Sequence, residues 1–166
     1  NYLNFKEAFM SIQNVKNHLK QFNLENRVLE FEVSSATVHE AALAVGSTEA
    51  EIAKTLSFLV GETPILIVVA GDMKIDNHKF KQTFLTKAKI IPFDDVISLI
   101  GHPVGGVCPF AVNAGVSVYL DESLKRFKFV YPAAGTASSA VKLTIQELEM
   151  ASNCHSWIDV CKNIEA

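Results

Sequence analysis

The sequence is poor in cysteine and has no long apolar run. Its three cysteines, Cys108, Cys154 and Cys161, form no Cys-x-x-Cys pair, which argues against a disulfide framework or a zinc site and favours a reducing compartment. The longest apolar run, residues 65–70, falls far short of the roughly 18 residues that a membrane-spanning helix needs. The first residues contain no signal-peptide core. We therefore expect a cytoplasmic protein without a membrane segment.

Several common ligand-binding motifs are also missing. No Gly-x-x-x-x-Gly-Lys-Ser/Thr loop occurs, and residues 101–105 do not match Gly-x-Gly-x-x-Gly, so nucleotide sites of the Walker or Rossmann type have no support. The five histidines are scattered and none pairs at ligand spacing, so we expect neither a metal nor a cofactor.

Charge restricts the partners. A formal net charge of −3 argues against a protein that coats nucleic acid, but it leaves room for a local basic patch that contacts one RNA end. The same lysines would also fit an ordinary exposed helix face. The lysines of this candidate patch are Lys74, Lys79, Lys81, Lys87 and Lys89.

Length and pattern predict a single α/β (α+β) domain over residues 1–166. The content of 49% hydrophobic and 20% charged residues is that of a globular chain. Several links are too short for parallel crossovers, which favours a mixed, mostly antiparallel sheet with flanking helices. Helices are predicted at residues 5–22, 37–46, 76–85, 94–100 and after 144. Strands are predicted at residues 27–33, 54–60, 65–70, 89–93, 116–120, 127–131, 141–144 and 157–160.

Lys54 is the unusual residue of the predicted hairpin of residues 54–60 and 65–70. Alternation places it in the same row as Leu56 and Phe58, the more apolar face of the strand. An ammonium there is costly unless it is paired or meets a charged ligand. The simpler interpretation is that Lys54 lies at the mouth of the strand and extends its charge to water.

A loop with bare backbone is predicted at residues 104–110. Gly105 and Gly106 are followed by Pro109, and adjacent glycines let N–H groups approach a ligand closely. Such groups can stabilise the oxyanion of ester hydrolysis, and a nearby lysine can bind a phosphate as a point charge. Lys54 and this loop therefore fit attack by water on an activated ester, without an enzyme nucleophile.

Cys108 in the same loop offers a second chemistry. It follows His102 closely in the sequence, and a thiolate nucleophile needs a base within hydrogen-bond reach. The alternative is a buried, unreactive cysteine.

The segments Ile52-Ala-Lys-Thr-Leu-Ser-Phe58 and Gly105-Gly-Val-Cys-Pro109 resemble motifs of the YbaK/ProX family of aminoacyl-tRNA deacylases. These are free-standing relatives of the editing domain inserted in bacterial prolyl-tRNA synthetases. The resemblance runs from about residue 28 to residue 160. Its further markers are Thr37-Val-His-Glu-Ala-Ala, Val69-Ala-Gly-Asp72, Asp121-Glu-Ser-Leu124, and Gly135 with Val141-Lys-Leu143. It implies a sheet curled toward a barrel and a trans-editing hydrolase that acts on mischarged aminoacyl-tRNA without a metal.

The resemblance also implies roles for individual residues. Lys54 would hold the terminal nucleotide and the ester. Backbone groups of Gly105 and Gly106 would orient the aminoacyl carbonyl and the water, assisted by the 2′-hydroxyl of the substrate. The other expected substrate contacts are Thr37, Val107, Cys108, Pro109 and Gly135.

One position departs from the deacylases of this family that remove Cys from tRNA for proline. Those proteins carry an Asp in a Gly-Leu-Asp-Ile setting, whereas Ala140 takes its place here. We therefore expect the removal of a small residue, such as Ala or Cys, from tRNA for proline. The expected partners are the 3′ acceptor end of the aminoacyl-tRNA and, as a further candidate, prolyl-tRNA synthetase. The alternative is a non-catalytic tRNA- or synthetase-binding module of the same fold.

Overall fold

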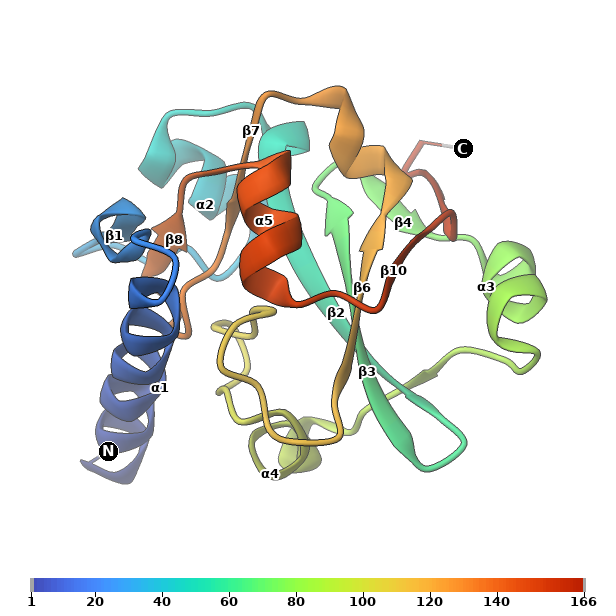
Figure 1. Ribbon diagram of the computed structural model, residues 1–166, viewed down its shortest axis with the longest axis horizontal. Coiled ribbons are helices and arrows are strands. Elements are labelled where there is room, and N and C mark those ends of the chain that lie inside the picture. Colours follow the sequence, from blue (N-terminus) through green and yellow to red (C-terminus); the bar gives the residue numbers. More distant parts are fainter. Residues whose placement is uncertain (1, 166) are drawn as a thin grey trace.

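Two long neighbouring strands, β2 (Ile52–Val60) and β3 (Thr63–Ala70), form the centre of the protein in the computed structural model, which describes residues 2–165. They pair along their length as the antiparallel hairpin that the alternating pattern predicted. Other strands extend this pair in the order β10-β6-β3-β2-β7-β9, and β5 pairs with the outer edge of β2 (Figure 1). The sheet is therefore built around the strand that carries Lys54.

The described residues contain five α-helices and eleven strands. The helices are α1 (Tyr2–Lys20), α2 (Val38–Val45), α3 (Asn77–Phe84), α4 (Val96–Ile100) and α5 (Ile145–Ser152). The remaining strands are β1 (Val28–Glu30), β4 (Met73–Ile75), β5 (Lys89–Ile90), β6 (Ser117–Asp121), β7 (Phe129–Pro132), β8 (Ser139–Val141), β9 (Leu143–Thr144), β10 (Ser156–Ile158) and β11 (Cys161–Asn163). The predicted mixed sheet is confirmed. The seven-stranded sheet has three antiparallel and three parallel strand pairs, and the two antiparallel pairs β1-β8 and β11-β4 form separate two-stranded sheets, which makes five of the eight pairs in the described chain antiparallel.

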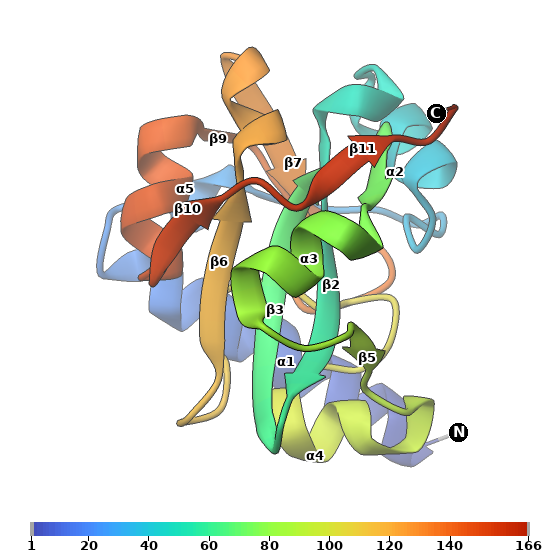
Figure 2. The same ribbon diagram turned by 90° about the vertical axis from the view of Figure 1, so that its right-hand side faces the viewer.

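Helices cover both faces of the curled sheet (Figure 2). On one face α3 packs its buried Phe80 against Phe58 of β2, with ring centroids 5.3 Å apart. On the other face α1 and α5 contribute Leu19 and Leu148 to the larger core, together with Val68 of β3. Because successive residues of a strand point to opposite faces, each core takes alternate residues of β2 and β3.

Side-chain caps hold the helix ends that the sequence predicted. Thr37 accepts a hydrogen bond from the Glu40 N–H at the start of α2, and Gly46 ends this helix at φ +76°. Thr144 and Glu147 form a complete capping box at the start of α5. These local signals fix the segments on either side of the central hairpin.

Two predicted boundaries are wrong around Pro92. The strand predicted over residues 89–93 ends after its first two residues, because Pro92 has no N–H to donate and precedes a 3₁₀ turn over Phe93–Asp95. As a result Asp94 does not cap α4. The N-cap position is Asp95, whose side chain makes no capping hydrogen bond.

The outer edge of β2 is paired at its two ends and open between them. β7 pairs with Ile52 and Ala53, and β5 pairs with Phe58 and Leu59. Between these contacts, residues 54–57 have no strand partner on that side within the described chain. The residues of this gap contribute to the wall of a cavity.

The C-terminal segment forms two strands instead of the single strand predicted over residues 157–160, and only the first of them joins the central sheet. β10 pairs parallel to β6, and β11 pairs antiparallel to β4 (Figure 2). Across residues 2–165, no helix has both the length and the apolar character needed to cross a membrane. Positions 1 and 166 of the predicted domain lie outside the described residues.

Candidate functional site

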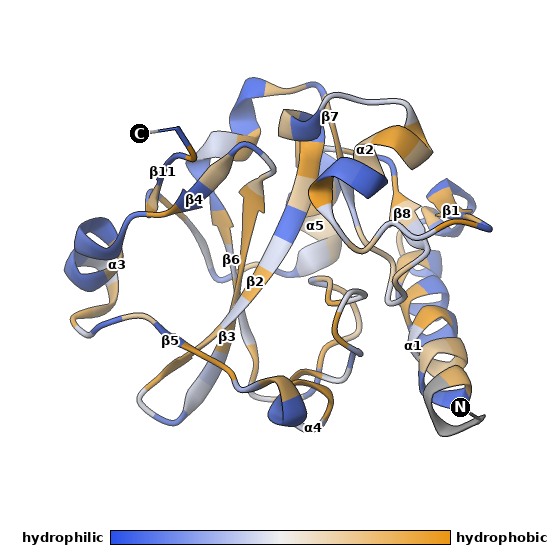
Figure 3. Cartoon of the chain, turned by 180° about the vertical axis from the view of Figure 1, so that it is seen from behind, coloured by the Kyte–Doolittle hydropathy of each residue, from blue (hydrophilic) through white to orange (hydrophobic). Residues whose placement is uncertain are grey.

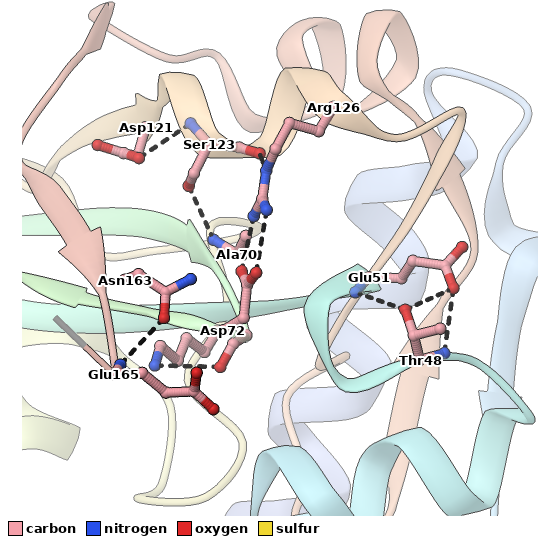
Figure 4. A network of polar contacts seen from close by, with 11 residues as sticks. Thr48, Glu51, Ala70, Asp72, Asp121, Ser123, Arg126, Asn163 and Glu165 are labelled. Carbon is pink, nitrogen blue, oxygen red and sulfur yellow. Dashed lines mark hydrogen bonds and ion pairs between the residues drawn. The ribbon is translucent and has the colours of Figure 1, made fainter.

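Lys54 is half-buried on β2, and its charge has no carboxylate partner within 4 Å in residues 2–165. Its Nζ donates a hydrogen bond of 3.5 Å to the Gly71 carbonyl oxygen. The nearby carboxylate of Asp72 is engaged instead by Arg126, which donates two hydrogen bonds of 2.6 and 2.9 Å (Figure 4). Lys54 therefore presents a cation that the described residues leave unneutralised.

Burial lowers the pKa of Lys54, and the charge of Asp72 offsets part of that shift. A lysine whose pKa is lower in the folded than in the unfolded chain destabilises the fold while it is charged. This penalty is full below the folded pKa and disappears as the pH rises toward the ordinary value of 10.5.

Lys54→Met is accordingly expected to raise the urea midpoint of unfolding at pH 7, with a gain that shrinks as the pH approaches 10.5. The measurement is urea unfolding at several pH values, in parallel with wild type. Lys81→Met, on the exposed face of α3, is the matched control and should leave the midpoint unchanged at each pH. A midpoint that falls at pH 7 for Lys54→Met would contradict the unpaired, half-buried charge.

The glycine loop has two glycines with different constraints. Gly105 has φ +90°, and a Cβ on it would lie 3.2 Å from the Cβ of Ala137. Gly106 lies against the backbone of the Gly135 turn, where an added Cβ would come within 2.4 Å of the Gly135 carbonyl carbon. The loop therefore approaches neighbouring backbone more closely than a side chain would allow.

The amides of this loop are not equivalent. The Gly106 N–H donates a hydrogen bond of 3.0 Å to the Pro103 carbonyl oxygen, so it is already engaged. For the N–H groups of Gly105 and Val107, the described residues provide no hydrogen-bond acceptor. The amides on either side of Gly106 are thus left without a partner among the described residues.

Lys54 and Gly105 line the same cavity, which has a volume of about 740 Å³. This volume lies within the range usual for small-molecule sites. Its lining residues come from the segment that begins α2, the open edge of β2, the segment from β5 to α4, the glycine loop, and β7 and β8. Figure 3 shows how the backbones of α2, β2, β5 and α4 are arranged. Ile90 and Phe93, both lining residues, are 72% and 73% exposed, so the cavity has an apolar rim open to solvent.

The structure brings half of the predicted site residues to this cavity. Its lining includes Thr37, Lys54, Gly105 and Val107. The others, which lie outside the lining, are Gly106, Cys108, Pro109 and Gly135.

Gly106 of the loop packs against the turn at Gly135, and neither residue lines the cavity. Gly135 has φ +98°, and a Cβ on it would meet the Ser11 hydroxyl of α1 at 2.7 Å. Helix α1 therefore packs against the Gly135 turn, and this turn packs against the glycine loop. These two glycines support the shape of the site from behind its surface.

Cys108 is not placed to act as a nucleophile. It is fully buried, and burial raises the pKa of its thiol to about 12. His102 lies 3.5 Å away through Nε2, but that nitrogen is 2.6 Å from the Phe110 carbonyl oxygen. A carbonyl can only accept, so Nε2 carries the proton and Nδ1 accepts from the Ser11 hydroxyl at 2.6 Å. His102 is therefore unable to deprotonate Cys108.

Cys108→Ala is expected to keep kcat/KM for ester hydrolysis within about twofold of wild type, because no reacting group is removed. The smaller side chain should cost about 1 kcal/mol of stability. Initial rates and thermal unfolding measured on the same preparation check both statements. A fully folded variant without activity would restore the thiol mechanism.

The lysines of the predicted basic patch do not act as one group. Lys79 forms an ion pair of 3.0 Å with Asp159 and donates to the Cys161 carbonyl oxygen, so its charge is already used. Lys81, Lys87 and Lys89 are exposed along α3 and the segment that follows it. Only Lys79 and Lys81 belong to α3, whereas Lys74 lies on β4, Lys87 follows the helix and Lys89 lies on β5.

Some cavity residues were not predicted as site residues. Thr55, Ile90, Phe93 and Tyr131 all line the cavity. Alternation along β2 places the side chains of Thr55 and Lys54 on opposite faces of the strand. The strand pattern alone therefore gave no sign that both residues line the same cavity. Ala140, which the sequence singled out, is a lining residue and is buried.

Comparisons with known proteins indicate the family of this chain. The family model of the aminoacyl-tRNA editing domain matches residues 32–151. The uncharacterized protein YwhH of Bacillus subtilis (strain 168) is 51% identical over 157 residues, which cover 94% of this chain and 100% of that protein.

Two solved structures extend the likeness to the fold. A candidate trans-editing enzyme for prolyl tRNA synthetase is similar at a TM-score of 0.83 and 28% identity, over 92% of this chain and 98% of that one. The hypothetical protein APE2540 is similar at a TM-score of 0.74 and 29% identity, over 82% of this chain and 91% of that one. With the family model matched over more than half of its length, this chain belongs to the aminoacyl-tRNA editing domain family.

Proposed function

We propose that this protein is a trans-editing deacylase that hydrolyses the ester between a small, wrongly attached amino acid and the 3′ end of tRNA for proline. The observation that carries the proposal is one cavity lined by Lys54, whose charge has no carboxylate partner among the described residues, and by Gly105 and Val107, whose N–H groups have no acceptor there. The family supports aminoacyl-tRNA as the substrate class. The name of one structural relative, a candidate trans-editing enzyme for prolyl tRNA synthetase, supports that synthetase as a partner of this protein.

The proposed reaction uses water as the nucleophile. The water oxygen bonds to the acyl carbon, the bond from that carbon to the ribose oxygen breaks, and the ribose leaves as an alcohol with the proton. The amides of Gly105 and Val107 donate to the acyl oxygen as its negative charge develops. Lys54 holds a phosphate or ester oxygen of the terminal nucleotide, and the 2′-hydroxyl of the substrate assists the water.

A small acyl group suits the wall around Ala140. Ala140 is 1% exposed and carries no charge. The neighbouring Ser139 hydroxyl already hydrogen-bonds the Ala134 N–H at 3.2 Å and the Thr136 hydroxyl at 2.9 Å. This part of the wall therefore supplies no carboxylate, which favours Ala over a residue that needs a polar contact. We assign residues 1–166 as one editing domain that acts in the cytoplasm.

The test is a panel of Ala-, Cys- and Ser-charged tRNA for proline, with correctly charged Pro-tRNA included. Wild type should deacylate at least one mischarged tRNA well above the buffer blank, with Ala the strongest expectation, and should spare Pro-tRNA. Rates equal to the blank on every mischarged tRNA would refute the enzyme. Binding of these tRNAs without turnover would then indicate the non-catalytic module.

A further inference from the structure

Thr55 carries a polar group that the fold leaves without a partner. Its Oγ1 is shielded from solvent, and residues 2–165 provide no hydrogen-bond partner for it. Thr55 also lines the cavity that Lys54 and Gly105 share. A buried hydroxyl without a partner costs free energy, so its presence calls for an explanation.

The backbone of Thr55 is unpaired at the same place. The Ser57 carbonyl accepts a hydrogen bond from the Ile91 N–H at 3.3 Å, so the backbone groups of Ser57 point away from β3. The register between β2 and β3 is regular, and along a strand every second residue points its N–H and C=O to the same side. The N–H and C=O of Thr55 therefore point to the open stretch of β2 between its contacts with β7 and β5.

Thr55 can therefore supply two kinds of acceptor to the cavity. Its carbonyl oxygen lies at the open strand edge. Its hydroxyl is shielded in this structure and meets a ligand in the cavity only after rotation about χ1, which leaves the backbone in place. Lys54 points to the opposite face of the strand, so its charge is directed away from the side chain of Thr55. Neutral oxygen acceptors in an apolar wall bind a cationic donor well, because charge-assisted hydrogen bonds are the stronger ones.

We infer that Thr55 is the subsite for the α-ammonium group of the aminoacyl ester, which donates to the Thr55 carbonyl oxygen and hydroxyl. This inference rests on the proposed function, since it names the part of the aminoacyl substrate that the open edge of β2 binds. No covalent step is involved. Substrates are required to carry a free amino group, and an N-acylated aminoacyl ester is refused.

Two stable adenosine amides test the inference without turnover. One is 3′-deoxy-3′-(L-alanylamino)adenosine, and the other is its propionylamino counterpart, which lacks only the amino group. Calorimetric titration of wild type should show at least tenfold tighter binding of the alanyl probe, the gain of a charge-assisted hydrogen bond. Equal affinity for the two probes, or binding of neither, would overturn the subsite.

The matched variants are Thr55→Val, Thr55→Ser and Thr83→Val. Thr55→Val removes the unpaired hydroxyl at constant shape, so it should raise the Tm by about 2 °C or more and reduce the preference for the alanyl probe about tenfold. Thr55→Ser should keep the preference. Thr83 is exposed on α3 and its hydroxyl donates to the Lys79 carbonyl, so Thr83→Val should change neither preference nor activity.

The outcomes separate the subsite from the proposed function. A raised Tm with the full amine preference kept in Thr55→Val would overturn the role of the hydroxyl. Deacylation of N-acetyl-alanyl-tRNA at the same rate as alanyl-tRNA would overturn the subsite while leaving the deacylase intact. An amine preference without hydrolysis of any mischarged tRNA would support the subsite and contradict the deacylase.

Discussion

Lys54→Ala is expected to lower kcat/KM for deacylation by about a hundredfold or more, the usual cost of removing one preorganised electrostatic contact from a reacting site. The cation is held at the cavity by one hydrogen bond of 3.5 Å to the Gly71 carbonyl, and Asp72, which could neutralise it, is held by Arg126. The decrease in kcat/KM should therefore come from the missing charge and not from a structural change in the residues around position 54. Initial rates on the best mischarged tRNA of the panel measure it.

Two comparisons make this result specific. Lys81→Ala removes an exposed lysine from α3 and should keep the wild-type rate. Lys54→Arg keeps the charge but changes the shape of the cationic head, so it should recover part of the activity. If folded Lys54→Ala deacylates as fast as wild type, the cation has no part in the reaction.

Gly106→Ala should lower stability strongly. Its Cβ would lie 2.4 Å from the carbonyl carbon of Gly135 and 2.5 Å from the Thr136 nitrogen, and neither backbone atom can rotate away. Overpacking of this kind costs about 3 kcal/mol, which corresponds to a fall in Tm of about 6–12 °C for a chain of this size. Activity should fall as well, because the loop that carries the amides of Gly105 and Val107 must shift.

Gly105 and Gly115 offer a matched pair for the same loop. Their φ angles are +90° and +89°, so Ala at either position incurs similar backbone strain of about 1–2 kcal/mol. A Cβ on Gly115 meets nothing within 4 Å, whereas one on Gly105 lies 3.2 Å from Ala137 at the cavity. Gly115→Ala should therefore lose stability alone, and Gly105→Ala should lose stability and activity together. Equal activity of the two variants would contradict the assigned role of the loop.

Local sequence patterns predicted the helices and strands whose formation depends on residues close together in the chain. The hairpin of β2 and β3 follows from alternation and from the turn at Gly61, and α2 follows from its cap at Thr37 and its stop at Gly46. The apolar row of Lys54 and the adjacent glycines could be recognised in the same way. These features depend on periodicity and backbone preference, which act within a few residues.

Features that depend on distant packing could not be predicted in this way. The Gly106 N–H is occupied by Pro103, and Gly135 is buried against α1, so these two glycines contribute support where direct contact was expected. Thr55 reaches the cavity because β7 and β5 leave a gap along β2, a property of three strands and not of one. The spacing of residues in the sequence does not predict which edge of a strand lacks a neighbouring strand.

The contact between α1 and the rear of the site also bears on how the chain matures during synthesis. Ser11 leaves the ribosome long before His102 and the Gly135 turn, yet it hydrogen-bonds the first at 2.6 Å and packs against the second. Helix α1 therefore cannot pack against these partners until most of the polypeptide has left the ribosome, because contacts between residues distant in the sequence form late. The glycine loop gains its support from the Gly135 turn and α1 in that final step, so we expect a nascent or truncated chain to hold a formed sheet without a fully shaped cavity.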